Sequence, residues 1–128
     1  KAVGDELSGR LIPAVEVRLR GLYRLLPPDY YEAADNLADF CDRIEKQYGV
    51  RPVIYCTERT YKNIVASDSR FNKDKIWYES LFSKPDEDMN WTFWTYTNRV
   101  KFSFYESGEY LHMTVFNGSE DDFKKLIL

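Results

Sequence analysis

The sequence predicts an α/β fold with a parallel sheet, and three observations support this class. Short apolar segments of strand-like composition occur at residues 11–19, 53–56 and 91–96. A long segment with helical periodicity separates the first two. The first segment is apolar except at its C-terminal end, as parallel strands often are. Strands that alternate with helices form parallel sheets, so we expect functional residues at the carboxyl ends of the strands.

Residues 11–19 are predicted to form the strand around which the chain is organised. Alternate side chains of a strand point to opposite faces, so Glu16 and Arg18 share one face, with Ile12 and Ala14 further along it. Two interpretations are open at this point. The pair marks a site at the end of a parallel strand, or it is a solvated ion pair on an edge strand.

A helix is predicted to begin after Asp29 and to end at Gly49. Asp29 and Glu32 have the spacing of a capping box, and Gly49 is placed to adopt the left-handed C-cap conformation. Apolar residues recur between them at spacings of three and four, which predicts one buried stripe. The stripe consists of Ala33, Ala34, Leu37, Phe40, Cys41, Ile44 and Tyr48.

The remaining elements complete the pattern. Thr57 is placed to cap a short helix that runs to Val65, and Ser119 is placed to cap a terminal helix. Residues 67–75 are polar and predict a loop. The predicted strands after the first are residues 53–56, 76–82 and 91–96, followed by a hairpin of 100–105 and 110–115 that turns at Ser107-Gly108.

Composition limits the function. The 128 residues suit one domain, residues 1–128, and 44% apolar with 16% aromatic residues is enough for a packed core. A net charge of −3 gives no basic patch, which argues against nucleic acid as a partner. No apolar run is long enough to span a membrane, and no export signal is visible. One histidine and two widely spaced cysteines make a metal site improbable; we expect no metal and no cofactor, and the disulfide state stays open.

Five segments resemble, in order, the C-terminal half of a glycoside hydrolase family 25 lysozyme, a cellosyl-type muramidase. The clearest is Tyr-Gly-Val-Arg-Pro-Val-Ile-Tyr-Cys-Thr at residues 48–57, where the family has Tyr-Gly-x-x-Pro-x-Ile-Tyr-x-Thr. Trp-Thr-Phe-Trp-Thr-Tyr stands for the family's Trp-x-x-Trp-Gln-Tyr, and Phe-Asn-Gly-Ser for its closing segment. The five matching segments are residues 12–18, 48–57, 76–77, 91–96 and 110–119.

The resemblance implies a fold and an activity. The fold is an eight-stranded β/α (TIM-like) barrel, of which this chain supplies about four parallel strands, a hairpin and three helices. The activity is hydrolysis of the bond between muramic acid and glucosamine in peptidoglycan. Members of the family act on cell walls from outside the cytoplasm or as phage lysins. A half barrel leaves residues 11–18 at an open edge, so we expect an N-terminal half-barrel or a second copy to cover them.

The departures from the family pattern fall on chemical positions. The family's Asp-x-Glu, whose Glu is the general acid, is Glu16 and Arg18 here. The closing-strand Asp is His112, the Asn is Thr114, and the Gln between Trp and Tyr is Thr95. Arginine stays protonated at any working pH and is no general acid. Loss of positioned acid catalysis typically costs about 10² to 10⁴ in rate, so we expect Glu16 and Arg18 to pair and hydrolysis to be impaired.

Aromatic residues and the histidine have two interpretations each. Tyr55, Trp77, Trp94 and Tyr96 could bind substrate by stacking on sugar rings, but aromatic residues at strand spacing are often core. The match to family positions favours a binding role for Tyr55, Trp77 and Trp94. His112 could act as a replacement base or be structural. Strand alternation puts Trp94 and Tyr96 on one face of residues 91–96, and Trp91 and Phe93 on the other.

Three functions remain open from the sequence. The chain is a muramidase that is active once an N-terminal half is supplied, or a non-catalytic relative that binds cell-wall glycan or keeps only the fold. The third is a piece or engineered variant without its original role. The partner that the resemblance implies is peptidoglycan or a related glycan.

Overall fold

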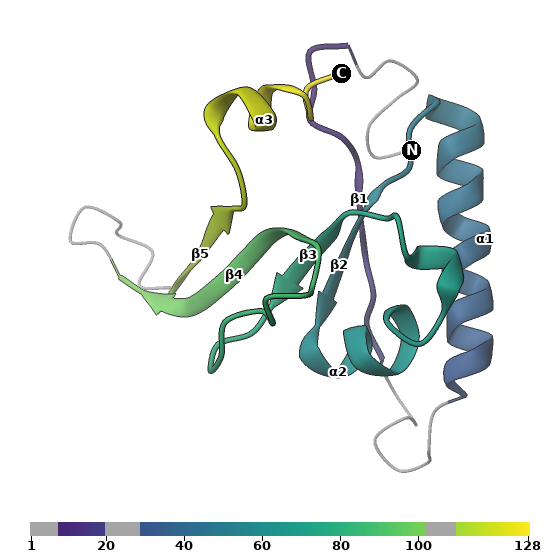
Figure 1. Ribbon diagram of the computed structural model, residues 1–128, viewed down its shortest axis with the longest axis horizontal. Coiled ribbons are helices and arrows are strands. Elements are labelled where there is room, and N and C mark those ends of the chain that lie inside the picture. The colour runs from purple at the N-terminus through teal and green to yellow at the C-terminus, as the bar shows by residue number, and fades with distance from the viewer. Residues whose placement is uncertain (1–7, 20–28, 102–109) are drawn as a thin grey trace.

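The computed structural model describes residues 8–19, 29–101 and 110–128, which contain one sheet of five strands in the order β1-β2-β3-β4-β5. The first four strands run parallel, and β5 is antiparallel to β4 (Figure 1). The predicted α/β class is confirmed. The strands are β1 (Ala14–Glu16), β2 (Val53–Thr57), β3 (Ile76–Glu79), β4 (Trp91–Val100) and β5 (Leu111–Phe116).

The long helix α1 (Tyr30–Tyr48) has the predicted bounds because both of its caps are local. The Asp29 carboxylate accepts the backbone N–H of Glu32 at 3.0 Å. Gly49 has φ 78°, and its N–H donates to the carbonyl of Glu45. The predicted stripe is wrong at Phe40, which is 47% exposed. The residues that α1 buries are Ala34, Leu37, Ala38 and Cys41.

Shorter helical segments connect the strands. Thr57 caps α2 (Glu58–Thr60) through a reciprocal pair of hydrogen bonds with Thr60, and the chain continues into a π-helical turn, η2 (Tyr61–Val65). Residues 67–75, predicted as a loop, contain the 3₁₀ turn η3 (Ser69–Phe71). Ser119 caps α3 (Glu120–Lys124) as predicted. Within the described ranges, no helix is long and apolar enough to cross a membrane.

The third strand ends earlier than the sequence predicts. β3 stops at Glu79, so Leu81 and Phe82 lie beyond it, and Phe82 is 99% exposed. The cause is a turn at Ser80, whose hydroxyl accepts the backbone N–H of Ser83 at 3.4 Å. Glu79 is therefore the last strand residue rather than an interior one.

The fourth strand carries a bulge that changes which side chains share a face. Trp91 lies opposite Ile76 and Phe93 lies opposite Trp77, so Thr92 is an extra residue. The Trp91 ring contacts the Trp94 ring, with 6.3 Å between centroids. The predicted pairing of Trp91 with Phe93 on one face is wrong, because one inserted residue reverses the alternation.

The hairpin is simpler than predicted. β4 itself continues to Val100 and pairs with β5, and the predicted turn at Ser107-Gly108 lies outside the described residues. No separate strand begins at Val100, because that residue still belongs to β4 and lies opposite Leu111.

The main core lies on one face of the sheet, between the strands and the segments α1 and η2. Leu37 and Cys41 of α1, Ile64 of η2 and Ile54 of β2 belong to one buried cluster. Figure 1 shows α1 alongside β1 and β2, with α3 at the opposite end of the sheet from α2. The other face of the sheet carries the alternate side chains of the same strands, including Glu16 and Tyr55.

The two ends of the described chain meet. Leu11 forms an antiparallel bridge with Ile127, the N–H of Ile12 donates to Leu126 at 2.9 Å, and the N–H of Leu128 donates to Arg10 at 2.8 Å. Residues 126–128 thus give residues 10–12 a backbone partner that the sequence did not predict.

Candidate functional site

One row of side chains crosses all five strands on the face away from α1. In register, Glu16 of β1 lies opposite Tyr55 of β2, and Tyr55 lies opposite Trp77 of β3. Trp77 lies opposite Phe93 of β4, and Phe93 lies opposite Phe116 of β5. The row therefore has a carboxylate at its β1 end and four aromatic rings beside it.

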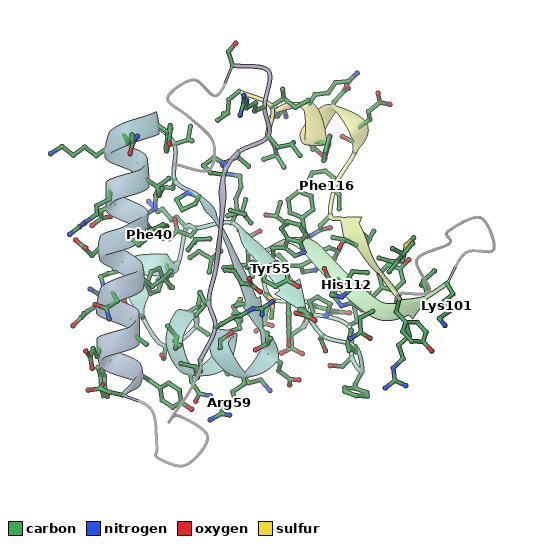
Figure 2. The ribbon with its side chains drawn as sticks, turned by 180° about the vertical axis from the view of Figure 1, so that it is seen from behind. Phe40, Tyr55, Arg59, Lys101, His112 and Phe116 are labelled. Atoms are coloured by element: carbon green, nitrogen blue, oxygen red, sulfur yellow. The ribbon has the colours of Figure 1, made fainter. Side chains whose placement is uncertain are left out.

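The rings of this aromatic row contact one another in sequence. Centroid distances are 5.0 Å from Tyr55 to Trp77, 5.1 Å from Trp77 to Phe93 and 5.5 Å from Phe93 to Phe116. Edge and tilted contacts of this kind are favourable and hold each ring in place. Figure 2 shows Tyr55, His112 and Phe116 over the sheet, away from α1. A cavity of about 380 Å³ borders the row and is lined by Trp77, Phe93, Phe116, His112 and Thr114, among others.

A second row of polar side chains lies next to the rings, toward the carboxyl ends of the parallel strands. Thr57, Glu79 and Thr95 are register partners across β2, β3 and β4, and Thr114 of β5 lies opposite Thr95. The indole N–H of Trp77 donates to Thr95 Oγ1 at 2.9 Å. The hydroxyls of Thr95 and Thr114 are 2.7 Å apart. This polar row thus fixes the orientation of the Trp77 ring.

Glu16 and Arg18 pair as predicted. Arg18 Nε donates to Glu16 Oε1 at 2.5 Å, and both side chains are about half exposed. The hydrogen bond to Glu16, followed by its charge, raises the pKa of Arg18 above its ordinary value. The carboxylate at the β1 end of the aromatic row therefore already has a permanent cation as its partner.

Tyr55 connects the two rows. Its hydroxyl donates to Glu79 Oε2 at 2.8 Å. Burial, then the hydrogen bond to Glu79 and its charge, raise the pKa of Tyr55 above the ordinary range. Tyr55 is consequently a neutral hydrogen-bond donor at physiological pH, and Glu79 is the acceptor.

The predicted site residues do not all come together. Glu16, Arg18, Tyr55 and Trp77 belong to one face, and His112 is an exposed residue that lines the neighbouring cavity. Trp94 and Tyr96 lie on the opposite face.

Register and ring contacts place these two residues. Trp94 lies opposite Tyr78, whose ring contacts Tyr61 of η2 at 5.9 Å, and the indole N–H of Trp94 donates to the carbonyl of Ser80 at 3.1 Å. The Tyr96 ring is 5.7 Å from that of Trp94. Trp94 and Tyr96 therefore do not lie beside Tyr55 and Trp77, and their role in substrate binding stays a prediction.

Sequence reasoning missed Glu79, Phe93 and Phe116 as parts of the site. The sequence predicts a strand of residues 76–82, which would place Glu79 in the interior of the strand and not at its carboxyl end. One signal could have found it, because it lies two residues after Trp77 and so shares its face. Among the residues described, no group of three or more His, Cys, Asp or Glu side chains could hold a metal ion.

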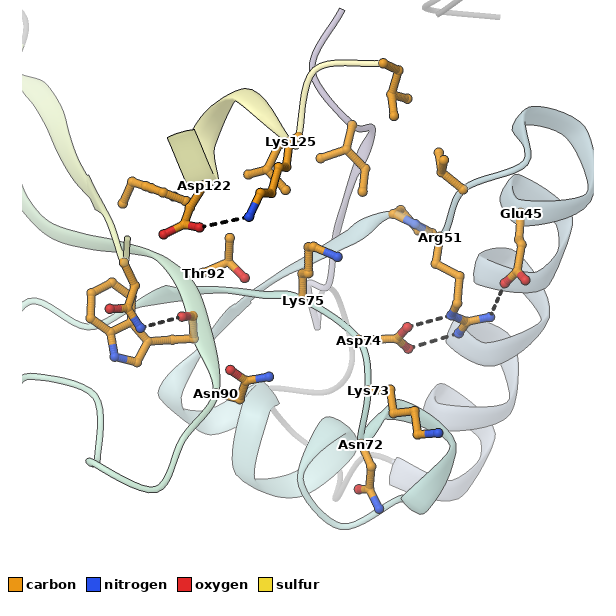
Figure 3. A pocket seen from close by; sticks show the side chains of 18 of the residues that line it. Glu45, Arg51, Asn72, Lys73, Asp74, Lys75, Asn90, Thr92, Asp122 and Lys125 are labelled. Carbon is orange, nitrogen blue, oxygen red and sulfur yellow. Dashed lines mark hydrogen bonds and ion pairs between the residues drawn. The ribbon is translucent and has the colours of Figure 1, made fainter. Parts of the chain in front are cut away.

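A second and larger cavity, of about 1090 Å³, lies near the amino ends of the parallel strands (Figure 3). Its wall includes Arg51, which donates to both carboxylate oxygens of Asp74 at 2.5 and 2.9 Å, and to Asp42 and Glu45 on α1. Asp74 is buried, with its side chain 3% exposed. This network ties α1 to the segment before β3, and the amino-end face of such folds commonly serves stability.

Comparisons with known proteins identify relatives with solved structures, whereas no curated protein matches. A family 25 glycosyl hydrolase from Bacillus anthracis is 28% identical with a TM-score of 0.78, over 93% of this chain and 55% of its own. A family 25 lysozyme from Aspergillus fumigatus is 18% identical with a TM-score of 0.72, over 97% of this chain and 60% of its own. A muramidase from Acremonium alcalophilum is 20% identical with a TM-score of 0.69, over 92% of this chain and 56% of its own.

The chain thus spans a little over half the length of these solved structures. The family model "Glycosyl hydrolases family 25" matches residues 24–103, which is more than half of the sequence. The matched range includes β2, β3 and most of the face described above. The chain belongs to glycosyl hydrolase family 25.

Proposed function

We propose that this chain is a cell-wall glycan-binding member of family 25 in which hydrolysis by the family mechanism is impaired. The observation that carries the proposal is the ion pair between Arg18 Nε and Glu16 Oε1 at 2.5 Å. It occupies the end of β1 where the resemblance expects Asp-x-Glu. The ligand is peptidoglycan or a related glycan, and the chain meets it outside the cytoplasm, at the cell wall.

The chemistry of glycoside hydrolysis supports the loss of activity. It needs one carboxylic acid that protonates the leaving oxygen and a second carboxylate that stabilises the positive charge of the transition state. Arg18 carries no transferable proton at working pH, and its pKa is raised further by Glu16. Glu16 already accepts a hydrogen bond from the guanidinium of Arg18, so a sugar would have to compete with Arg18 for this carboxylate. The pair therefore lacks a donor and adds a positive charge close to a site where positive charge develops.

The aromatic row supports the binding of glycan. Sugar rings present apolar faces that stack on flat side chains, and their hydroxyl groups hydrogen-bond to polar side chains at the rim. Here the Trp77 ring and Thr114 border a cavity of about 380 Å³. Glu79 and Thr95 follow Trp77 and Phe93 toward the carboxyl ends of their strands, and Thr95 accepts the indole N–H of Trp77. This arrangement provides stacking and polar recognition without requiring catalysis.

Hydrolysis is tested with the full 128-residue chain and labelled peptidoglycan, by measuring the release of reducing ends at high protein concentration. We expect no release above that of heat-denatured protein. Release that disappears in Glu16→Gln would show that the carboxylate still works and would overturn the proposed impairment. The variant Arg18→Glu serves as a comparison, because it removes the cation and restores a carboxyl group at that position.

Binding is tested by calorimetry with soluble N-acetylglucosamine oligomers and with peptidoglycan fragments. We expect Trp77→Leu to lower affinity about tenfold or more, because stacking on this ring is lost. Trp94→Leu is the matched control, since that ring lies on the opposite face, and it should leave affinity nearly unchanged. Thermal unfolding of both variants shows whether they remain folded. Absence of binding by the parent chain would refute glycan recognition.

A second candidate function is an active muramidase once the rest of a barrel is present. The observation that favours it is that the chain covers 55–60% of the solved relatives and forms an open five-stranded sheet. In this case residues 1–128 are one domain, the C-terminal half of the family's barrel, and an N-terminal half or a second copy covers residues 11–18. Hydrolysis that appears only when a family N-terminal half is added would support this candidate over the first.

A further inference from the structure

Among the described residues, Glu79 is the carboxylate of the site that forms no ion pair at contact distance. Glu16 is paired with Arg18 at 2.5 Å. Within residues 8–19, 29–101 and 110–128, the hydrogen bond that Glu79 accepts from a side chain comes from the neutral hydroxyl of Tyr55, and no ion pair reaches it. Glu16, Arg18 and Glu79 together carry one net negative charge. The charge of Arg18 also reaches Glu79, but the hydrogen bond of its guanidinium goes to Glu16.

The position of Glu79 leaves it able to accept a ligand. It is the last residue of β3 and is partly exposed, and its register neighbours Thr57 and Thr95 are neutral. An ionised carboxylate has about four acceptor sites, and Tyr55 uses one on Oε2. Tyr55 therefore holds the carboxylate in place without neutralising it.

Trp77 supplies an apolar surface next to this charge. Its side chain lies on the same face as that of Glu79, which follows two residues later in β3. Its N–H is already satisfied by Thr95, so the ring has no unmet polar group. The π face of an indole also attracts cations, which adds to the preference of a carboxylate for an ammonium group.

We propose that Glu79, Tyr55 and Trp77 form a subsite for a glucosamine unit whose amino group is free and protonated. The proposal rests on the proposed function, namely that this face binds glycan, and it names the chemistry that the face selects. The carboxylate of Glu79 accepts hydrogen bonds from the ammonium group, and the sugar ring stacks on Trp77. An N-acetylated unit offers a neutral amide N–H instead and loses the charge-assisted bond.

The test is calorimetry of the full chain with two ligands of equal length, glucosamine oligomers and N-acetylglucosamine oligomers, at pH 6 and low salt. We expect the glucosamine oligomer to bind roughly tenfold more tightly, the usual size of a partly exposed charge-assisted hydrogen bond. The isosteric variant Glu79→Gln, which still accepts from Tyr55, should remove this preference. It should change affinity for the acetylated oligomer less than about threefold.

A matched variant separates a local effect from general attraction to an acidic protein. Glu87→Gln removes the same charge from an exposed position in the loop after β3, and it should keep the preference. Equal affinity for the two oligomers, or a preference that survives in Glu79→Gln, overturns the subsite. An equal loss in Glu87→Gln does so too, because the attraction is then not local. Failure of both oligomers to bind refutes the proposed glycan recognition itself, whereas binding without preference refutes the subsite alone.

Discussion

The contact between Arg51 and Asp74 is expected to be a major stabilising interaction, and Asp74→Asn tests it. Asp74 is almost fully buried and receives two hydrogen bonds from the guanidinium. Breaking a fully buried ion pair by removing one charge costs about 3–5 kcal/mol. Here Arg51 is about one third exposed and keeps Asp42 and Glu45 as partners, so solvent and the remaining carboxylates screen the loss.

We therefore expect Asp74→Asn to lower the free energy of unfolding by about 2 kcal/mol, or the Tm by about 7 °C for a domain of this size. Urea unfolding followed by circular dichroism at pH 7 measures the change. The control is Asp39→Asn, because Asp39 pairs with Arg43 at 2.9 Å but both side chains are well exposed. That variant should lose less than about 0.5 kcal/mol. A loss for Asp74→Asn no larger than the control would refute the reasoning.

Three further predictions follow from packing, backbone and burial. Ile54→Ala should cost about 3 kcal/mol in urea unfolding because the side chain is fully buried, whereas Phe40→Ala, at a site 47% exposed, should cost less than about 1 kcal/mol. Gly49→Ala should cost about 1 kcal/mol in the same measurement, because φ is +78° and no contact compensates. Burial raises the pKa of the thiols of Cys41 and Cys56 from about 9 to about 11 and about 12. The stability that comes from keeping these thiols protonated is thus complete below pH 9 and decreases as pH rises toward 11. Tm should therefore fall over that range, and it should fall less steeply in Cys56→Ala. Equal slopes in the two proteins would contradict this.

The elements whose signals are local were predictable from the sequence. The bounds of α1 follow from Asp29 and Gly49, each of which makes its capping bond to a residue three or four positions away. The caps at Thr57 and Ser119 are equally local. The pairing of Glu16 with Arg18 followed from strand alternation alone. In each case one short stretch of sequence contains both partners of the interaction.

The parts of the site that depend on register were not predictable. The bulge at Thr92 determines that Phe93 rather than Trp91 continues the aromatic row, and it arises from pairing between β3 and β4. The end of β3 at Glu79 depends on the turn at Ser80. Arg51 and Asp74 are 23 positions apart, so their network is not visible in either segment alone.

The meeting of residues 10–12 with residues 126–128 has a consequence for how the protein folds. This short ladder joins segments separated by more than a hundred positions, so it closes a very long loop. Closure of such a loop has a large entropic cost that is recovered only when both segments are in place. During synthesis, residues 10–12 gain this partner only after residues 126–128 have been made. The amino end of β1 is therefore expected to be among the last parts of the sheet to become protected from hydrogen exchange.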